Sequence, residues 1–402
     1  MSKFYTIIKK EKNKYNFVEK VNDKEYNKKG EITKTSHGLY SENNMLGIKF
    51  PNITSCSYFF SFDKNRDGQY VSVKDETIKN SNMSLPPYVK EGSIIMNTSK
   101  VEDFSYFLKS NSSKLIEFTP NIDYSSAKDM RYAFAYLSSL EKIHDINSKN
   151  CKIFIGTFCE CRNLKEVNID TTSGTIMTDM FYRCLKLKRI SLKTENVEDF
   201  IRCFEFCSSL TNVSLSSLNN GKNFNVMFGG CSSLKEINLK NETKRGTSFD
   251  SMFEKCSSLE KIEGLDVQSA VVGEYWTQAY PKFYNTFDGC FSLKTLDMKN
   301  IKKTLNLKDS SLLTEESILN ISKELCTVPD DFKGHDRIYI TFNDNDRIKN
   351  YLNNTYCRVI DSADSKKPIE LVEKDTDLAI SLADYIKNEK GWGLYYASAS
   401  ND

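Results

Sequence analysis

The sequence predicts a mixed α/β chain whose middle is a repeat solenoid with a parallel sheet. A small β-rich N-terminal domain and an α+β C-terminal cap are expected to flank it. Three observations support this: phenylalanines recur at a nearly constant step, the same apolar pattern follows each of them, and the pattern is missing at both ends. Because stacked repeats share one core, this periodicity decides the fold. We place the domains at residues 1–95, 96–310 and 311–402.

The repeat unit reads Phe-x-x-Cys-x-x-Leu-x-x-Ile-x-Leu, as in the copy from Phe181 to Leu192. In the first copy Leu137 replaces the cysteine. The last two apolar positions are two apart, so both point to one side of a strand, and stacked strands form a parallel sheet. The anchoring residues recur every 23 to 25 residues, with one final step of 34, and are Phe134, Phe158, Phe181, Phe204, Phe228, Phe253 and Phe287.

The other half of the unit has helical spacing. An aromatic residue or methionine often precedes the phenylalanine by four residues, as in Met177 and Phe181 or Phe200 and Phe204. Residues four apart lie on one face of a helix, so Phe-x-x-Cys is expected to form a short helical turn opposite the sheet.

Half of the twelve cysteines occupy one repeat position. Stacking should turn them into a column of small buried thiols, in keeping with the usual burial of free cysteine. A zinc site is disfavoured because the close pair Cys159 and Cys161 lacks a second pair, and a disulfide framework because no secretory signal is seen. We therefore expect no metal and no cofactor. The six are Cys161, Cys184, Cys207, Cys231, Cys256 and Cys290.

Two copies share Met-Phe-x-x-Cys-Ser-Ser-Leu, namely residues 227–234 and 252–259. This motif resembles BspA-type leucine-rich repeats, which are widespread in bacterial surface proteins and in proteins encoded by phages. The resemblance covers about half of the chain. It implies adhesion or protein binding and supplies no catalytic residues.

The N-terminal part lacks the repeat. Apolar stretches at 4–8, 45–50, 58–62 and 70–73, separated by polar turns, predict β-strands. The segment from Asp63 to Gly68 matches the start of a calcium loop, yet its twelfth position is Lys74 rather than glutamate. Asp67-Gly68 is also a strong hairpin signal. A plain hairpin is favoured, and calcium binding stays open.

The period ends again near Leu313. Residues 313–325 predict an amphipathic helix capped by Thr314, followed by a strand at 337–342 and a second helix at 377–389. The order, which closes on Gly391-Trp392-Gly393, resembles the segment that ends repeat arrays in many phage tail-associated proteins. The chain continues with Leu-Tyr-Tyr, where that pattern usually has a polar residue and alanine.

Charge and hydropathy exclude several classes of function. The 56 basic and 54 acidic residues give a net charge of +2, which disfavours nucleic acid as a partner. The lysine-rich stretch from Lys9 to Lys34 is interpreted as a solvated face. No apolar run is long enough to cross a bilayer, so no membrane insertion is expected. The first residues lack the apolar core of a signal peptide.

Two surfaces are candidates for binding a partner. The first is the exposed strand face, with Asn168, Ser191, Ser214 and Asn238 pointing outward; we name these four residues the outward column. Its polar residues fit a solvated face as well as a binding face, and it lacks aromatic rings for stacking on sugars. The second is the enlarged repeat with Tyr275, Trp276 and Tyr280, whose rings are typical interface anchors. Alternatively, these rings pack on the C-terminal cap.

No pattern indicates catalysis. The three histidines lie outside any metal or nucleophile motif, and no phosphate loop or nucleophile elbow is present. A carboxylate pair of the glycosidase kind leaves no sequence mark, so it stays open.

The leading hypothesis is a non-enzymatic phage virion or tail-associated protein, assembled in the host cytoplasm, that acts in attachment or assembly. The alternative is a bacterial surface adhesin or protein-interaction module. Expected partners are other virion proteins or a host cell-surface protein or glycan, and a homo-oligomer is compatible with either role.

Overall fold

The computed structural model describes residues 100–109, 122–270, 283, 285–328, 338–361, 363–364 and 366–400, apart from the side chains of 144 and 145, together with the backbone of strands β1–β8. The chain forms two compact units. One comprises residues 1–196 and 214–216, and the other comprises 197–213 and 217–402. Each unit is described by itself.

The first unit begins with antiparallel strands. An antiparallel sheet has the order β4-β3-β2-β1-β5, and β6 pairs with β7 so that Asp63 faces Val71. This pair confirms a hairpin around the predicted turn, while residues 65–69 of the loop lie outside the described part. The strands are β1 (Tyr5–Glu11), β2 (Lys14–Val21), β3 (Lys24–Tyr26), β4 (Ile32–Thr35), β5 (Met45–Lys49), β6 (Phe62–Lys64) and β7 (Tyr70–Ser72).

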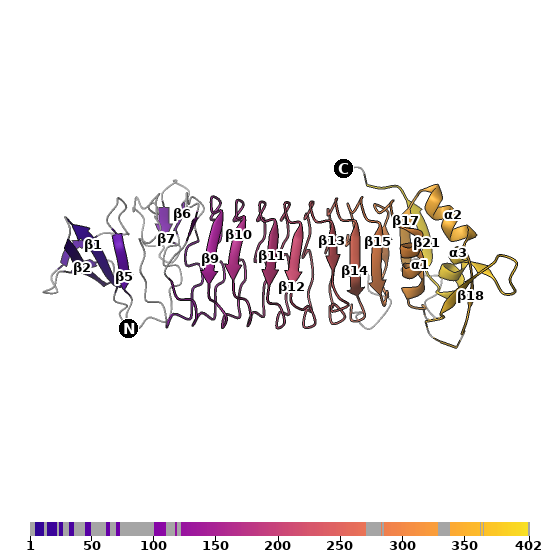
Figure 1. Cartoon of the computed structure of the whole chain (residues 1–402), viewed down its shortest axis with the longest axis horizontal. Helices are drawn as coiled ribbons and strands as arrows, with labels where there is room; N and C mark the ends of the chain where they lie inside the picture. The colour runs from indigo at the N-terminus through magenta and orange to yellow at the C-terminus, as the bar shows by residue number, and fades with distance from the viewer. Residues whose placement is uncertain are drawn as a thin grey trace. The chain divides into compact units, whose positions relative to one another are not determined.

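The repeats of each unit carry one short strand per turn, and these strands run side by side in Figure 1. β8, β9 and β10 pair in parallel in the first unit, as β13, β14 and β15 do in the second. Exposed and buried residues alternate along β11, as the spacing of two predicts. The strands are β8 (Glu117–Phe118), β9 (Lys142–Ile146), β10 (Glu166–Ile169), β11 (Arg189–Leu192), β12 (Asn212–Leu215), β13 (Glu236–Asn238), β14 (Lys261–Asp266) and β15 (Thr295–Lys299).

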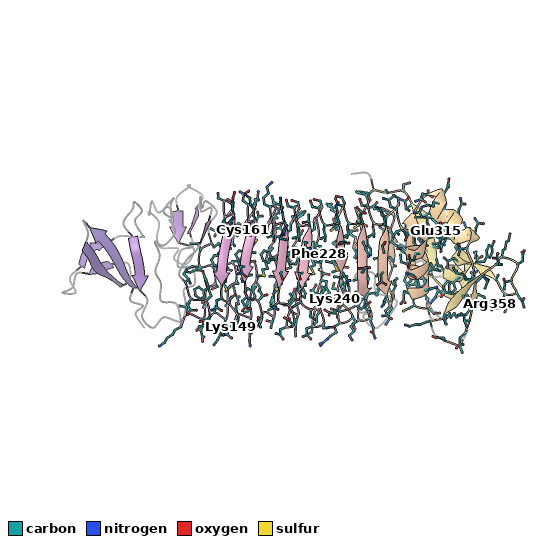
Figure 2. All side chains as sticks on the ribbon, viewed as in Figure 1. Lys149, Cys161, Phe228, Lys240, Glu315 and Arg358 are labelled. Atoms are coloured by element: carbon teal, nitrogen blue, oxygen red, sulfur yellow. The ribbon has the colours of Figure 1, made fainter. Side chains whose placement is uncertain are left out.

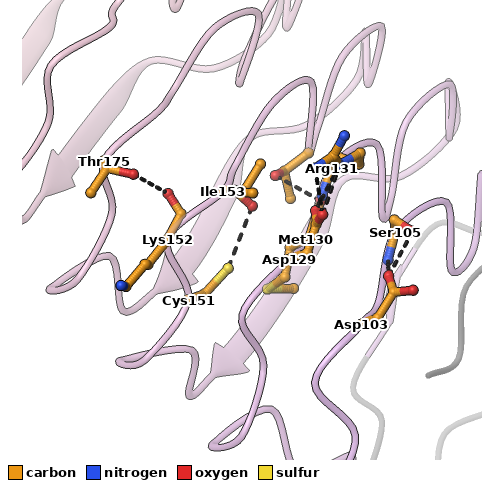
Figure 3. A network of polar contacts seen from close by, with 10 residues as sticks. Asp103, Ser105, Asp129, Met130, Arg131, Cys151, Lys152, Ile153 and Thr175 are labelled. Atoms are coloured by element: carbon orange, nitrogen blue, oxygen red, sulfur yellow. Dashed lines mark hydrogen bonds and ion pairs between the residues drawn. The ribbon is translucent and has the colours of Figure 1, made fainter. Parts of the chain in front are cut away.

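A second line of parallel bridges joins successive turns away from the strands. In the first unit it runs through Asp103, Asp129, Ile153 and Ile176, and in the second through Asp199, Asn223 and Ser248. Carboxylates at this line fix the chain locally. Asp103 Oδ1 accepts from the backbone N–H and the hydroxyl of Ser105, and Asp129 pairs with Arg131 (Figure 3). Each bridge thus adds backbone hydrogen bonds between neighbouring turns.

The Phe-x-x-Cys segment forms tight turns, so the expected short helix is wrong. Residues two before and two after each phenylalanine adopt the left-handed conformation, for example Tyr132 (φ 51°) and Tyr136 (φ 65°) around Phe134. Left-handed residues cannot continue a right-handed helix. The backbone N–H groups instead donate to the next turn, as Phe134 does to Thr157 O at 2.9 Å. The residues four apart that suggested a helix, such as Met177 and Phe181, are both buried on the inner side of a turn.

Stacked rings and thiols fill the core of the repeats, whose side chains are drawn in Figure 2. In the first unit Phe134, Phe158 and Phe181 stack at centroid separations of 5.4 Å. In the second, Phe204 and Phe228 stack at 5.5 Å. All six cysteines of the predicted set are buried and none forms a disulfide, so their predicted burial is confirmed. The Cys161 thiol lies 3.1 Å from Phe134 O of the preceding turn, so its S–H has an acceptor.

The C-terminal residues form a mixture of strands and helices. β16, β17 and β21 form a parallel sheet, and β18 pairs in antiparallel fashion with β19 and β20. α1 starts at the predicted cap, because Thr314 Oγ1 accepts from Ser317 N at 3.2 Å. The elements are β16 (Leu305–Leu307), α1 (Glu315–Glu324), β17 (Tyr339–Asn343), α2 (Asp346–Asn354), β18 (Tyr356–Val359), β19 (Ile369–Val372), β20 (Ile380–Ser381), α3 (Leu382–Asp384), a π-helical turn η2 (Tyr385–Glu389) and β21 (Gly393–Ala397).

Two predictions here needed correction. The helix expected over 377–389 begins only at Leu382, where Ser381 caps it. Helix α2, capped by Asn345, lies in a stretch for which no helix was expected. α2 buries only Ile348 and Leu352, so its apolar pattern is too sparse to stand out in the sequence.

Candidate interaction surface

The outward column lies on the exposed side of the strands, as predicted. Asn168, Ser191, Ser214 and Asn238 are all exposed, while their strand neighbours Ile169, Leu192 and Leu239 are buried. The first three residues belong to the first unit and Asn238 to the second. Asn238 Oδ1 accepts from Lys240 N at 2.8 Å, which ties that side chain to its own backbone.

Buried hydroxyls hold the ends of these strands in place. Thr171, fully buried, donates to Lys193 O at 2.8 Å and accepts from Lys193 N at 3.0 Å. Thr194, also fully buried, donates its N–H to Ser216 Oγ at 2.8 Å. A buried polar group costs free energy unless it has partners. These hydroxyls form hydrogen bonds with backbone N–H and C=O groups just after each strand. They thereby fix the position of the strands that carry the outward residues.

Several exposed charges are paired between consecutive repeats. Lys165 Nζ lies 2.8 Å from Glu141, and Lys142 lies 3.5 Å from Glu166. In the second unit Glu198 and Glu260 are paired with Lys222 and Lys294 at 2.7 Å, and the lysine hydrogen bond lowers the pKa of each carboxyl. Exposed pairs of this kind add little stability. At these positions the repeats carry a balanced, mixed-charge surface.

One repeat is different. Residues 180–194, named the basic repeat below, contain five cationic residues and no acidic residue. The stretch one repeat earlier, 157–171, has two cations and three carboxylates. Lys186, Lys188, Arg189 and Lys193 are exposed, and Arg183 is partly exposed beside Glu160. Along the sequence the densest basic stretch is Lys9–Lys34, so this shorter cluster does not stand out there. A count of charge per repeat would have found it.

Arg189 and Ser191 share the outward side of β11, since Ile190 and Leu192 between and after them are buried. Lys186, Arg189 and Lys193 form no ion pair with any carboxylate that the structure describes. Arg189 and two exposed ammonium groups are thus available around a residue of the outward column.

The second predicted surface cannot be placed. Tyr275, Trp276 and Tyr280 lie outside the described residues. The enlarged repeat therefore stays a prediction, both as a binding loop and as a contact with the C-terminal part.

The buried thiols are poor nucleophiles. Burial raises the pKa of Cys151 and Cys256 to about 12 and that of Cys231 well above its ordinary value. Because the thiolate is the reactive form, these cysteines are inert at neutral pH. Within the described ranges no three His, Cys, Asp or Glu side chains are grouped so that they could hold a metal ion. No described helix has the length and apolarity to cross a membrane.

Comparison with known proteins agrees with this geometry. Parallel strands, inter-repeat bridges and a ring-and-thiol core are compatible with a leucine-rich-repeat fold. More particularly, residues 128–260 match the family model of the BspA-type leucine-rich-repeat region, with six copies. Repeats of this type suggest a protein-interaction or surface module. No curated protein and no solved structure matches the chain.

Proposed function

We propose that the chain is a non-enzymatic protein-interaction module in which a repeat solenoid, flanked by N- and C-terminal domains, presents the outward side of its strands to a partner protein. The observation that carries this is the contrast between the two sides of each strand. Inward positions repeat the same apolar residues, whereas outward positions change from repeat to repeat. Solubility alone would not require this variation, because paired surface charges such as Lys165 and Glu141 already provide it.

Photocrosslinking tests the proposal. A photoreactive residue replaces Ser191, on the outward column, or Lys149, an exposed residue in the turn after β9. In cells that make the protein, position 191 is expected to crosslink to a discrete partner protein and position 149 is not. Equal crosslinking at both positions, or none at 191, would argue against the strand face as the contact surface.

The more specific setting is proposed to be a phage virion, with a role in attachment or assembly; a bacterial surface adhesin is the other setting. Support for the virion comes from the resemblance of the C-terminal segment to ends of tail-associated repeat arrays. Partners would be virion proteins or a host surface protein or glycan. Immunoblotting of gradient-purified phage particles and of washed bacterial envelopes separates the two: the virion setting requires the protein in the particles, in constant proportion to capsid protein.

A further inference from the structure

We infer that the exposed side of the basic repeat is a docking surface for a short acidic segment of a partner protein. This deepens the proposed function and rests on it, because it names the chemistry of the partner at the strand face. The surface consists of Lys186 and Lys188 before strand β11, Arg189 and Ser191 on it, and Lys193 after it.

The charges of the basic repeat lie close together along one strand. Arg189 points outward from β11, and the three lysines flank the same strand within eight residues of chain. At about 3.3 Å per extended residue, Lys188 to Lys193 span roughly 15–17 Å along strand β11, and Lys186 lies in the turn just before it. An extended segment of about six to eight residues laid along the strand could reach all four.

Three of these cations, Lys186, Arg189 and Lys193, differ from lysines elsewhere in the first unit in having no ion-pair partner among the described carboxylates. Elsewhere in the first unit lysines are paired with carboxylates of the neighbouring turn, as Lys165 is with Glu141. In the basic repeat, Lys186, Arg189 and Lys193 are exposed and form no ion pair with a described carboxylate. Like charges in such proximity cost free energy that an acidic ligand relieves. Arg189 adds a planar donor suited to two-point binding of a carboxylate.

The extent of the positive region determines which kind of polyanion fits it. The positive region is one repeat wide, because the preceding turn carries Glu160, Glu166 and Asp170, and Glu195 follows Lys193. A long, uniformly charged polyphosphate or acidic polysaccharide would extend over these carboxylates. The strand face also lacks aromatic residues at the described outward positions 166, 168, 189 and 191, so sugar rings find no stacking platform. A few carboxylates on a protein segment match both the extent and the chemistry.

The chain itself offers a conservative way to remove the cluster. One repeat later, at a spacing of 23 residues, the equivalent positions are Ser209, Thr211, Asn212 and Ser216. The variant K186S/K188T/R189N/K193S therefore places residues that the repeat already tolerates at exposed positions. A control, K149S/K235T/K240S/K244S, removes the same charge from exposed lysines elsewhere.

The test uses the full chain and a fluorescent octaglutamate peptide, with binding followed by anisotropy at low salt and again at 0.5 M salt. We expect the basic-repeat variant to bind at least tenfold more weakly, the control to stay within about twofold of the parent, and salt to weaken parent binding. Equal loss in both variants, or none in the first, would overturn the inference. So would tight, cluster-dependent binding of inorganic polyphosphate with no binding of octaglutamate.

Crosslinking from position 191 in the same variant separates this inference from the proposed function. Loss of the crosslinked partner together with loss of octaglutamate binding supports both. If the partner persists while the cations are absent, the strand face remains the contact surface and the acidic-segment inference fails.

Discussion

The repeats and the C-terminal residues 305–400 meet the same demand, the burial of polar groups, in different ways. In the repeats each solution is used many times: a cysteine S–H on the phenylalanine carbonyl one turn earlier appears for Cys161, Cys231 and Cys256 at 3.1–3.2 Å. In the C-terminal part, two buried groups are instead held by contacts particular to each of them. The ammonium of Lys390, fully buried, donates to the carbonyls of Lys323 and Lys366, and Trp392 Nε1 donates to Cys326 O at 2.7 Å. Contacts that recur in every repeat leave a regular spacing in the sequence, from which the fold can be predicted. Contacts made at one place leave no such pattern.

The largest expected difference between the regions is their response to alkali. Burial raises the thiol pKa values in the repeats, and those of Cys151 and Cys256 reach about 12. A raised folded-state pKa gives stability that is full below the unfolded value and is lost as pH rises toward the folded one. Above pH 9 each such thiol should cost up to about 1.4 kcal/mol per pH unit. Urea unfolding followed by circular dichroism at pH 8, 9 and 10 should show a steep loss.

The matched variant for this effect is Cys231→Ala combined with Cys256→Ala. It should be less stable at pH 7 because two buried side chains shrink, yet its stability should fall less steeply above pH 9. A parallel decline of parent and variant would show that the thiols do not set the alkaline limit.

Removal of one stacked ring tests the shared core. Phe228 is fully buried between Phe204 and Phe253, at 5.5 and 5.7 Å. Phe228→Ala should cost about 3–5 kcal/mol in the free energy of unfolding, from lost burial and the cavity that remains. Phe228→Leu, which keeps most of the volume, should cost clearly less. Equal costs would mean that the stacked geometry, rather than filled volume, dominates this core.

Lys390 should give the opposite pH response. Burial lowers its pKa to about 8, so between pH 8 and 10.5 the unfolded chain binds more protons than the folded one. Stability from this group therefore rises with pH over that window, by on the order of 1–2 kcal/mol after allowance for solvent screening. Of the chain's two tryptophans, Trp392 lies beside this contact. In a Trp276→Phe background its fluorescence reports unfolding of this region, and Lys390→Met should abolish the rise. A rise that persists in Lys390→Met would exclude this ammonium as its source.

The smallest expected effect concerns backbone strain within the repeats. Val226 adopts φ 56°, a left-handed conformation that β-branched residues strongly disfavour. Val226→Asn should raise the free energy of unfolding by about 1 kcal/mol, since asparagine tolerates this conformation. Val226→Ala, which shortens the side chain but keeps a Cβ, serves as the control and should bring less gain. A loss of stability with asparagine would show that the valine side chain packs too well to be given up.

Sequence spacing predicted the parts that repeat: the strand positions, the inward phenylalanines, the thiol column and the exposed side of Asn168 and Ser191. It misjudged the turns, because Tyr132 and Val226 occupy left-handed positions where glycine or asparagine would normally reveal them. It also gave no hint of Lys390, whose burial depends on carbonyls 67 and 24 residues away in the chain. The basic repeat stands out in the sequence only when charges are counted repeat by repeat.

The central claim is that inward residues of the repeats set stability while outward residues set partner choice. The most direct test measures unfolding and crosslinking from position 191 together, in K186S/K188T/R189N/K193S and in Phe228→Leu. The surface variant should keep its unfolding midpoint and lose the partner, and the core variant should lose stability and, while folded, keep the partner. If the surface variant retains the partner, or loses it only because it unfolds, the claim is contradicted.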